Sequence, residues 1–190
     1  METFLYSRLN KICRIKDKTA ILTLGPFSVA LTRIIDSAER NKDDLVNGEF
    51  VCYRGISLPN KVLNEWCQNR NISLDGYSSS SRDESLAMYF AFDSAKTSKD
   101  TVPVLLVIKI KNESSKHYFC MDKPDYTCFP DEKEILLQAG LVFNLDEFSR
   151  DSKINKIYLS TSERKIRNHR CKQNFVLATP FVISWFIQTS

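Results

Sequence analysis

Apolar residues recur with helical spacing near the start of the chain. Between Phe27 and Arg40 they occupy one face of a helix, at Phe27, Leu31, Ile34, Ile35 and Ala38, which predicts an amphipathic helix. A second helical pattern opens at Pro59, with Val62, Leu63, Trp66 and Cys67 on its apolar face. Residues 1–25 show no firm pattern. The polar stretches 41–48 and 69–76 are expected to be loops.

Short apolar runs with strand character fill most of the remaining chain. We expect these strands at 49–55, 103–110, 117–119, 134–138, 141–148 and 154–160. Four serines at 78–81 precede a third helical pattern, and Ser81 with Glu84 has the spacing of a capping box, which predicts a helix start at Ser81. Helices come first and a strand-rich half follows, so the fold class is α+β.

The length of 190 residues indicates one domain. We expect it to span residues 1–163, with a helical part at 1–47 and a β-rich core at 48–163. The tail, 164–190, is basic and then apolar, and three roles stay open for it: a packed element, a partner-binding segment or a membrane-surface patch. The basic run at 164–172 is typical of a solvated segment.

The net charge and the cysteine content limit the kinds of ligand, metal site and partner that we expect for this chain. A net charge of +4 fits an anionic small molecule or a nucleic acid, but no basic and aromatic groove is evident, so we expect no nucleic-acid partner. Six cysteines without a C-x-x-C pair, and two histidines, argue against a metal site and favour reduced thiols. No secretory signal and no apolar run of roughly 18 residues is seen, which favours a cytoplasmic protein, with export by another route left open.

Arg54 and the serines are the first candidates for chemistry. Arg54 ends a predicted strand and is followed by Gly55. Its guanidinium group therefore lies where a ligand can approach the backbone closely, an arrangement that can bind a diphosphate. An exposed arginine paired with a surface acid is the alternative. The serine run can be a plain polar turn or cap, or its hydroxyls can orient a neighbouring carboxylate.

Glu132 and Glu134 are the third candidate. They stand two residues apart, so they share one side of the sheet if the strand begins by Glu132. Cleavage of a glycosidic bond to a cationic leaving group needs no general acid. It needs a carboxylate near the ribose to stabilise an oxocarbenium-like transition state. A second carboxylate can then take a proton from the nucleophile. A solvated strand edge neutralised by Lys133 is the alternative.

Together these segments resemble the R-S-E group of arginine-directed mono-ADP-ribosyltransferases. The similar segments run from residue 26 to about residue 160: Cys52-Tyr53-Arg54-Gly55, residues 76–82 with the helix at 87–91, Phe129–Leu136 with its Glu-x-Glu motif, and the strand at 140–144. The resemblance implies an ADP-ribosyltransferase-like split two-sheet β core, with N-terminal and flanking helices, that binds NAD.

The resemblance also implies a role for each motif residue. Arg54 is expected to contact the diphosphate of NAD or its ribose, and Gly55 is expected to contact the carboxamide. Ser79 and Ser81 are expected to bind on the nicotinamide side, and Glu134 is expected to bond the ribose 2′-hydroxyl. Glu134 is also expected to stabilise the oxocarbenium-like transition state and Glu132 to prepare an acceptor guanidinium. Tyr126 and Phe129, in the loop 120–131, are expected to contact the target protein. With four serines, the motif could instead begin at Ser78.

The implied reaction transfers ADP-ribose from NAD, as co-substrate and without a metal, to an exposed arginine of an acceptor protein, and releases nicotinamide. We expect a monomer. Three alternatives stay open: an NAD glycohydrolase that uses the same Arg54, Ser79 and Glu134 with water as acceptor, a transferase that modifies nucleic acid, and a catalytically silent NAD-binding module.

Overall fold

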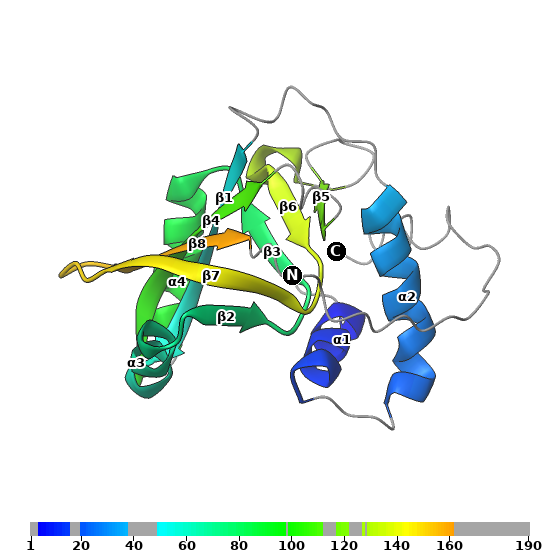
Figure 1. Cartoon of the computed structure of the whole chain (residues 1–190), viewed down its shortest axis with the longest axis horizontal. Helices are drawn as coiled ribbons and strands as arrows, with labels where there is room; N and C mark the ends of the chain where they lie inside the picture. Colours follow the sequence, from blue (N-terminus) through cyan, green and yellow to red (C-terminus); the bar gives the residue numbers. More distant parts are fainter. Residues whose placement is uncertain are drawn as a thin grey trace.

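A computed structural model describes residues 4–15, 20–37, 49–97, 99–111, 117–121, 127 and 129–161 (Figure 1). The predicted tail at 164–190 and Tyr126 therefore lie outside the described residues. The helices within these ranges are α1 (Phe4–Ile15), α2 (Ile21–Ser37), α3 (Asn60–Gln68), α4 (Glu84–Lys96) and the short 3₁₀-helix η3 (Pro130–Glu132). None of the helices in this part of the chain is long and apolar enough to cross a membrane.

The strands form one sheet in the order β2-β7-β8-β4-β1-β3-β6-β5. Their bounds are β1 Glu49–Pro59, β2 Asn71–Leu74, β3 Ser78–Ser81, β4 Thr101–Lys111, β5 Tyr118–Cys120, β6 Glu134–Leu137, β7 Leu141–Ser149 and β8 Asn155–Thr161. All neighbouring strands are antiparallel except β4 and β8. The mixed sheet with its flanking helices confirms the predicted α+β class.

The sheet has two parts with a narrow junction. β1 pairs with β4 along its whole length, from Glu49 to Pro59. On its other edge, β1 pairs with β3 only at Tyr53 and Ser81. A five-stranded part therefore meets a three-stranded part, β3-β6-β5, at a single residue pair, which is the split core that we expected.

The central strand β4 is apolar on both faces because both faces are covered. Leu106 and Ile108 are fully buried in the main core with residues of β1, β6 and β7. Leu105 is fully buried in a separate cluster with Ala87 and Ala91 of α4. A strand covered on both sides reads as a continuous apolar run, which explains why the sequence pattern identified β4 clearly.

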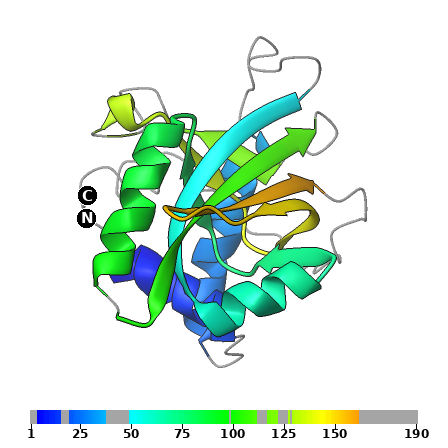
Figure 2. The same ribbon diagram turned by 90° about the vertical axis from the view of Figure 1, so that its left-hand side faces the viewer.

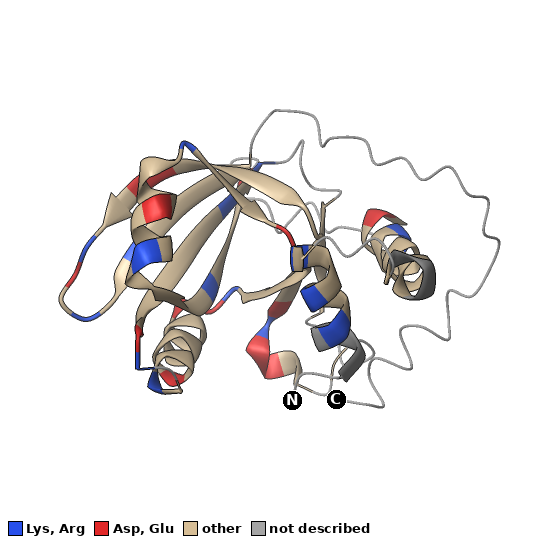
Figure 3. Ribbon diagram, turned by 90° about the horizontal axis from the view of Figure 1, so that it is seen from below, with Lys and Arg blue, Asp and Glu red and all other residues tan. Residues whose placement is uncertain are grey.

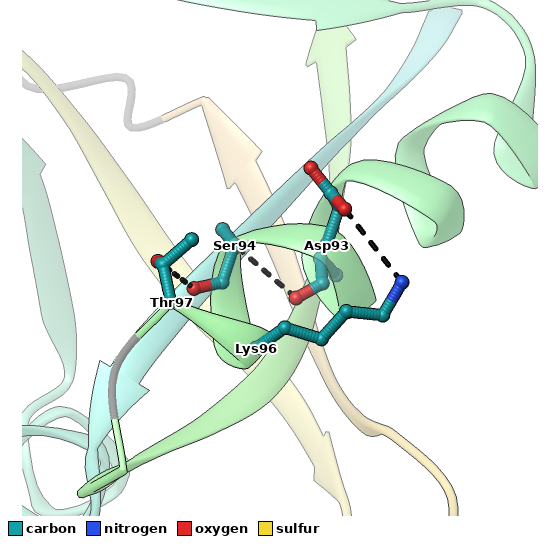
Figure 4. Close-up of polar contacts among 5 residues, drawn as sticks. Asp93, Ser94, Lys96 and Thr97 are labelled. Atoms are coloured by element: carbon teal, nitrogen blue, oxygen red, sulfur yellow. Dashed lines mark hydrogen bonds and ion pairs between the residues drawn. The ribbon is translucent and has the colours of Figure 1, made fainter.

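Helix α4 lies directly on β1, because Gly55 has no side chain. A Cβ atom at Gly55 would collide with the carbonyl oxygen of Ala87 and would lie 2.6 Å from the backbone nitrogen of Ala91. At its C-terminal end, α4 satisfies carbonyl groups with hydroxyls: Ser94 Oγ donates to Ala91 O at 3.0 Å and Thr97 Oγ1 donates to Ser94 O at 2.7 Å (Figure 4).

Helices α1 and α2 lie on the opposite side of the molecule from α3 and α4, near β5 and β6 (Figures 1 and 2). Leu9 and Ile35 pack with Tyr77 and Leu136 in a cluster of their own. The Tyr77 hydroxyl donates to Ser28 O at 2.8 Å and lies 2.9 Å from Thr32 Oγ1. These contacts attach the N-terminal helices to the β3 and β6 end of the sheet.

Three expectations about element boundaries were wrong. Residues 1–25, which showed no firm pattern, contain α1. The helix expected at 27–40 is α2, which begins earlier, at Ile21, and runs through Pro26. The expected loop 69–76 contains strand β2, whose alternate residues are buried. Helix α4 begins at Glu84 and its N-cap is Asp83, whose side chain accepts from Ser85 N and Leu86 N; Ser81 is the last residue of β3.

Candidate active site

Three adjacent strands, β1, β3 and β6, carry the motif residues Arg54, Ser79 and Glu134. Ser81 lies opposite Tyr53 of β1 on one side and opposite Glu134 of β6 on the other. Segments that are far apart in the sequence therefore meet at the junction between the two parts of the sheet. The strand order alone brings the three predicted motifs together.

The Arg54 side chain connects β1 to β3 just where their main-chain pairing ends. Its Nη1 donates a hydrogen bond to the carbonyl oxygen of Ser79, two residues from the single β1–β3 pair at Ser81. One guanidinium group offers five N–H donors in a planar fork. Arg54 thus both stabilises the junction and places a cation beside the Ser79 backbone.

Glu134, at the start of β6, is a partly buried carboxyl group with a raised pKa. Burial is the largest cause of the raised pKa, and the nearby Glu132 carboxylate raises it further. The Ser79 hydroxyl, which hydrogen-bonds the carboxylate, and the positive charge of Arg54 act in the opposite direction. A carboxylate in such surroundings is held in one orientation and gains free energy when positive charge develops next to it.

Glu132 is not on the strand, so the condition under which it would share one side of the sheet with Glu134 is not met. It ends the 3₁₀-helix η3, and Lys133 then adopts a left-handed conformation with φ 46° and ψ 46° before β6 begins at Glu134. The strand rule that places residues i and i+2 on one side of a sheet does not apply to this turn. Glu132 and Glu134 are nevertheless close enough to interact electrostatically.

Ser81 connects the η3 turn to the start of α4. Its hydroxyl donates to the carbonyl oxygen of Glu132 at 2.7 Å and accepts from the backbone nitrogen of Asp83 at 2.9 Å. The backbone nitrogen of Arg82 donates to the carbonyl oxygen of Lys133 at 3.2 Å. The segment 81–83 therefore holds the turn that carries Glu132, a role that the motif comparison had not indicated.

The other two serines of the run have structural contacts. Ser78 and Ser80 are buried; Ser78 Oγ donates to Gly76 O at 3.2 Å, and Ser80 Oγ donates to Ile135 O at 2.9 Å. Of the four serines, only Ser79 is among the groups that lower the pKa of Glu134. This geometry favours Ser79 over Ser78 as the first residue of the motif.

The remaining predicted residues lie around this centre or outside the described part. Gly55 follows Arg54 on β1 with its Cα against α4. Phe129 precedes η3, and the residue is 53% exposed. Tyr126 falls among the residues that the structure does not describe, so its predicted role is not tested.

The remaining features are the distribution of charged residues and the side chains that could bind a metal ion. Basic and acidic positions both occur on the described helices and strands (Figure 3). Within the ranges that the structure describes, no group of three His, Cys, Asp or Glu side chains could hold a metal ion.

No family model and no curated protein matches this sequence. Solved structures do match. ADP-ribosyltransferase Vis from Vibrio splendidus in complex with agmatine aligns with a TM-score of 0.56 and 18% identity over 87% of this chain and 72% of that chain. HopU1, an ADP-ribosyltransferase of Pseudomonas syringae pv. tomato, aligns with a TM-score of 0.57 and 18% identity over 85% and 67%.

A eukaryotic protein shows the same similarity. A mutant of the mono-ADP-ribosyltransferase ART2.2 in complex with NADH aligns with a TM-score of 0.55 and 18% identity over 90% of this chain and 66% of that chain. Identities this low establish the fold alone. The chain therefore has an ADP-ribosyltransferase fold.

Proposed function

We propose that this chain is a mono-ADP-ribosyltransferase that uses NAD as co-substrate, transfers ADP-ribose to an arginine side chain of a target protein and releases nicotinamide. One observation carries the proposal: the fold brings Arg54, Ser79 and Glu134 together on three adjacent strands, where Arg54 donates a hydrogen bond to the Ser79 carbonyl oxygen and both residues lower the pKa of Glu134. In addition, Vis aligns as an agmatine complex and ART2.2 as an NADH complex.

The residues at the site fit NAD chemically. Arg54 provides the planar donors that bind a diphosphate, and the backbone of the adjacent Gly55 binds the carboxamide of nicotinamide. Ser79 lies on the nicotinamide side. The leaving group already carries a positive charge, so the bond between the ribose C1′ and nicotinamide breaks without a general acid, and nicotinamide departs neutral with the bonding electron pair.

Glu134 acts on the bond that breaks. Its carboxylate accepts a hydrogen bond from the ribose 2′-hydroxyl and stabilises the positive charge that develops on the sugar. Ser79 holds the carboxylate in position through its hydroxyl. Because burial and Glu132 disfavour the ionised form of Glu134, the carboxylate interacts more strongly with a cationic sugar than a solvated carboxylate would.

Glu132 acts on the acceptor. It accepts a hydrogen bond from the incoming guanidinium and takes its proton as the guanidinium nitrogen bonds to C1′. Phe129, which is exposed just before the turn, and Tyr126 contact the target protein. The products are ADP-ribosylated arginine, nicotinamide and one proton on Glu132, which passes to solvent.

Nicotinamide release by the purified chain tests the cleavage step. We expect Glu134→Gln to slow release by about 100-fold or more, the typical loss when a group that stabilises transition-state charge is removed. Glu147→Gln, the same change at an exposed residue of β7, is the matched control and should leave release unchanged. Equal release by Glu134→Gln and the unmodified chain would refute the assignment.

The acceptor step is tested with agmatine as an arginine mimic. Glu132→Gln should lose transfer to agmatine but keep nicotinamide release, because only the acceptor needs this carboxylate. Nicotinamide release without transfer in the unmodified chain would identify a glycohydrolase. Stabilisation by NAD without any release would identify a silent binding module.

A further inference from the structure

Glu132 depends on its turn for its position, because no strand holds it. Lys133 is the sole described residue other than glycine that has a positive φ, at 46°. A left-handed conformation at such a residue persists only where its surroundings enforce it. The question is which contacts enforce it here.

Four hydrogen bonds hold the turn. Two are internal: Glu132 N donates to Phe129 O at 3.0 Å and Lys133 N donates to Pro130 O at 3.1 Å. Two come from the segment before α4: Ser81 Oγ donates to Glu132 O at 2.7 Å and Arg82 N donates to Lys133 O at 3.2 Å. Of the two external bonds, one is made by a side chain.

The Ser81 hydroxyl is itself well positioned. It is buried, at 6% exposure for the residue, and it accepts a hydrogen bond from Asp83 N. Asp83 in turn caps α4, whose Ala87 and Ala91 pack against β1 beside Gly55. A continuous set of contacts therefore runs from the β1–α4 packing to the carbonyl group of Glu132.

We propose that Ser81, together with the left-handed Lys133, is a positioning element that places the Glu132 carboxylate for the acceptor and so sets how ADP-ribose is divided between a guanidinium and water. The inference rests on the function proposed above. It replaces the expected contact between Ser81 and NAD with a contact to the acceptor side of the site.

One property separates this role from general support of the fold. Glu134 keeps its own contacts, since β3 pairs with β6 from Glu134 onward and the Ser79 side chain favours the ionised carboxylate. Loosening the η3 turn therefore affects the acceptor step more than the cleavage of NAD. A purely structural role would lower both steps in proportion.

The test measures transfer to agmatine and nicotinamide release for each variant, and takes their ratio. Ser81→Ala should lower the ratio by roughly tenfold, the effect of losing one positioning hydrogen bond in a reaction that depends on orientation, and should raise the KM for agmatine. Ser78→Ala is the matched control, because it removes one buried hydroxyl of the same strand that bonds Gly76 instead, and its ratio should not change.

A second pair of variants decides the matter if Ser81→Ala does not fold. Lys133 is exposed, so its replacement leaves the core intact. Lys133→Val should lower the ratio, because a β-branched residue resists positive φ, whereas Lys133→Asn should preserve it, because asparagine tolerates this conformation. Both changes remove the same charge.

The outcomes separate the two claims. Active variants whose ratios all equal that of the unmodified chain would overturn the positioning role and leave the proposed function standing. An unmodified chain that releases no nicotinamide would overturn the proposed function, and the positioning role with it.

Discussion

At the scale of single residues, the site is built around Glu134, a carboxyl group whose surroundings disfavour its ionised form. Burial and the neighbouring Glu132 raise the pKa of Glu134, and Ser79 and Arg54 offset this only in part. The folded chain therefore holds the proton of Glu134 more tightly than the unfolded chain does. A residue that reduces stability when it ionises is typical of functional sites.

This leads to a prediction about stability and pH. Between the ordinary pKa of 4.5 and the raised value in the folded protein, the native state binds more protons, so the free energy of unfolding falls as pH rises through this interval. Glu134→Gln cannot ionise. Its melting temperature should therefore exceed that of the unmodified chain by more at neutral pH than at pH values below 4.5. A difference that is the same at every pH would contradict the raised pKa.

At the scale of elements, the site depends on how closely α4 lies on β1. Arg54 is next to Gly55, the residue on which the α4 backbone rests, and Asp83 at the N-cap of α4 bonds to Ser81. The helix thus couples the strand that carries the arginine to the turn that carries Glu132. A change in this packing is expected to affect stability and both carboxylates.

Gly55→Ala tests the packing directly. The added Cβ meets backbone atoms of α4, which cannot rotate away, so we expect a loss of about 3 kcal/mol in the free energy of unfolding, at the upper end of the usual overpacking cost. Gly140→Ala is the control: no atom lies within 4 Å of its added Cβ, and its φ of +80° should cost about 1 kcal/mol. Denaturant titration measures both values, and equal losses would contradict the close approach.

At the scale of the whole molecule, the sequence predicts the α+β fold class, but it misses several of the helices and strands. Arg54, Ser79 and Glu134 come from local motifs, and the strand order brings them together. The Glu132 turn could not be predicted, because nothing in the local pattern marks Lys133 as left-handed. Its conformation depends on hydrogen bonds from residues about fifty positions earlier in the chain.

The sequence did not predict the elements whose formation depends on long-range packing more than on the local residue pattern. Helix α1 is stabilised by contacts such as that of Leu9 with the Tyr77 and Leu136 cluster, which a mixture of basic and apolar residues does not reveal. Strand β2 is half polar and short, and its pairing with β7 makes it a strand. Strand β4 has a continuous apolar run, so the local pattern was enough to predict it.

Mapping the modified residues by mass spectrometry, after a cell lysate is treated with the chain and NAD, tests the central claim most directly. We expect ADP-ribose on arginine side chains with the unmodified chain, far less with Glu132→Gln and none with Glu134→Gln. NAD consumption with no modified protein, or ADP-ribose attached to residues other than arginine, would contradict it.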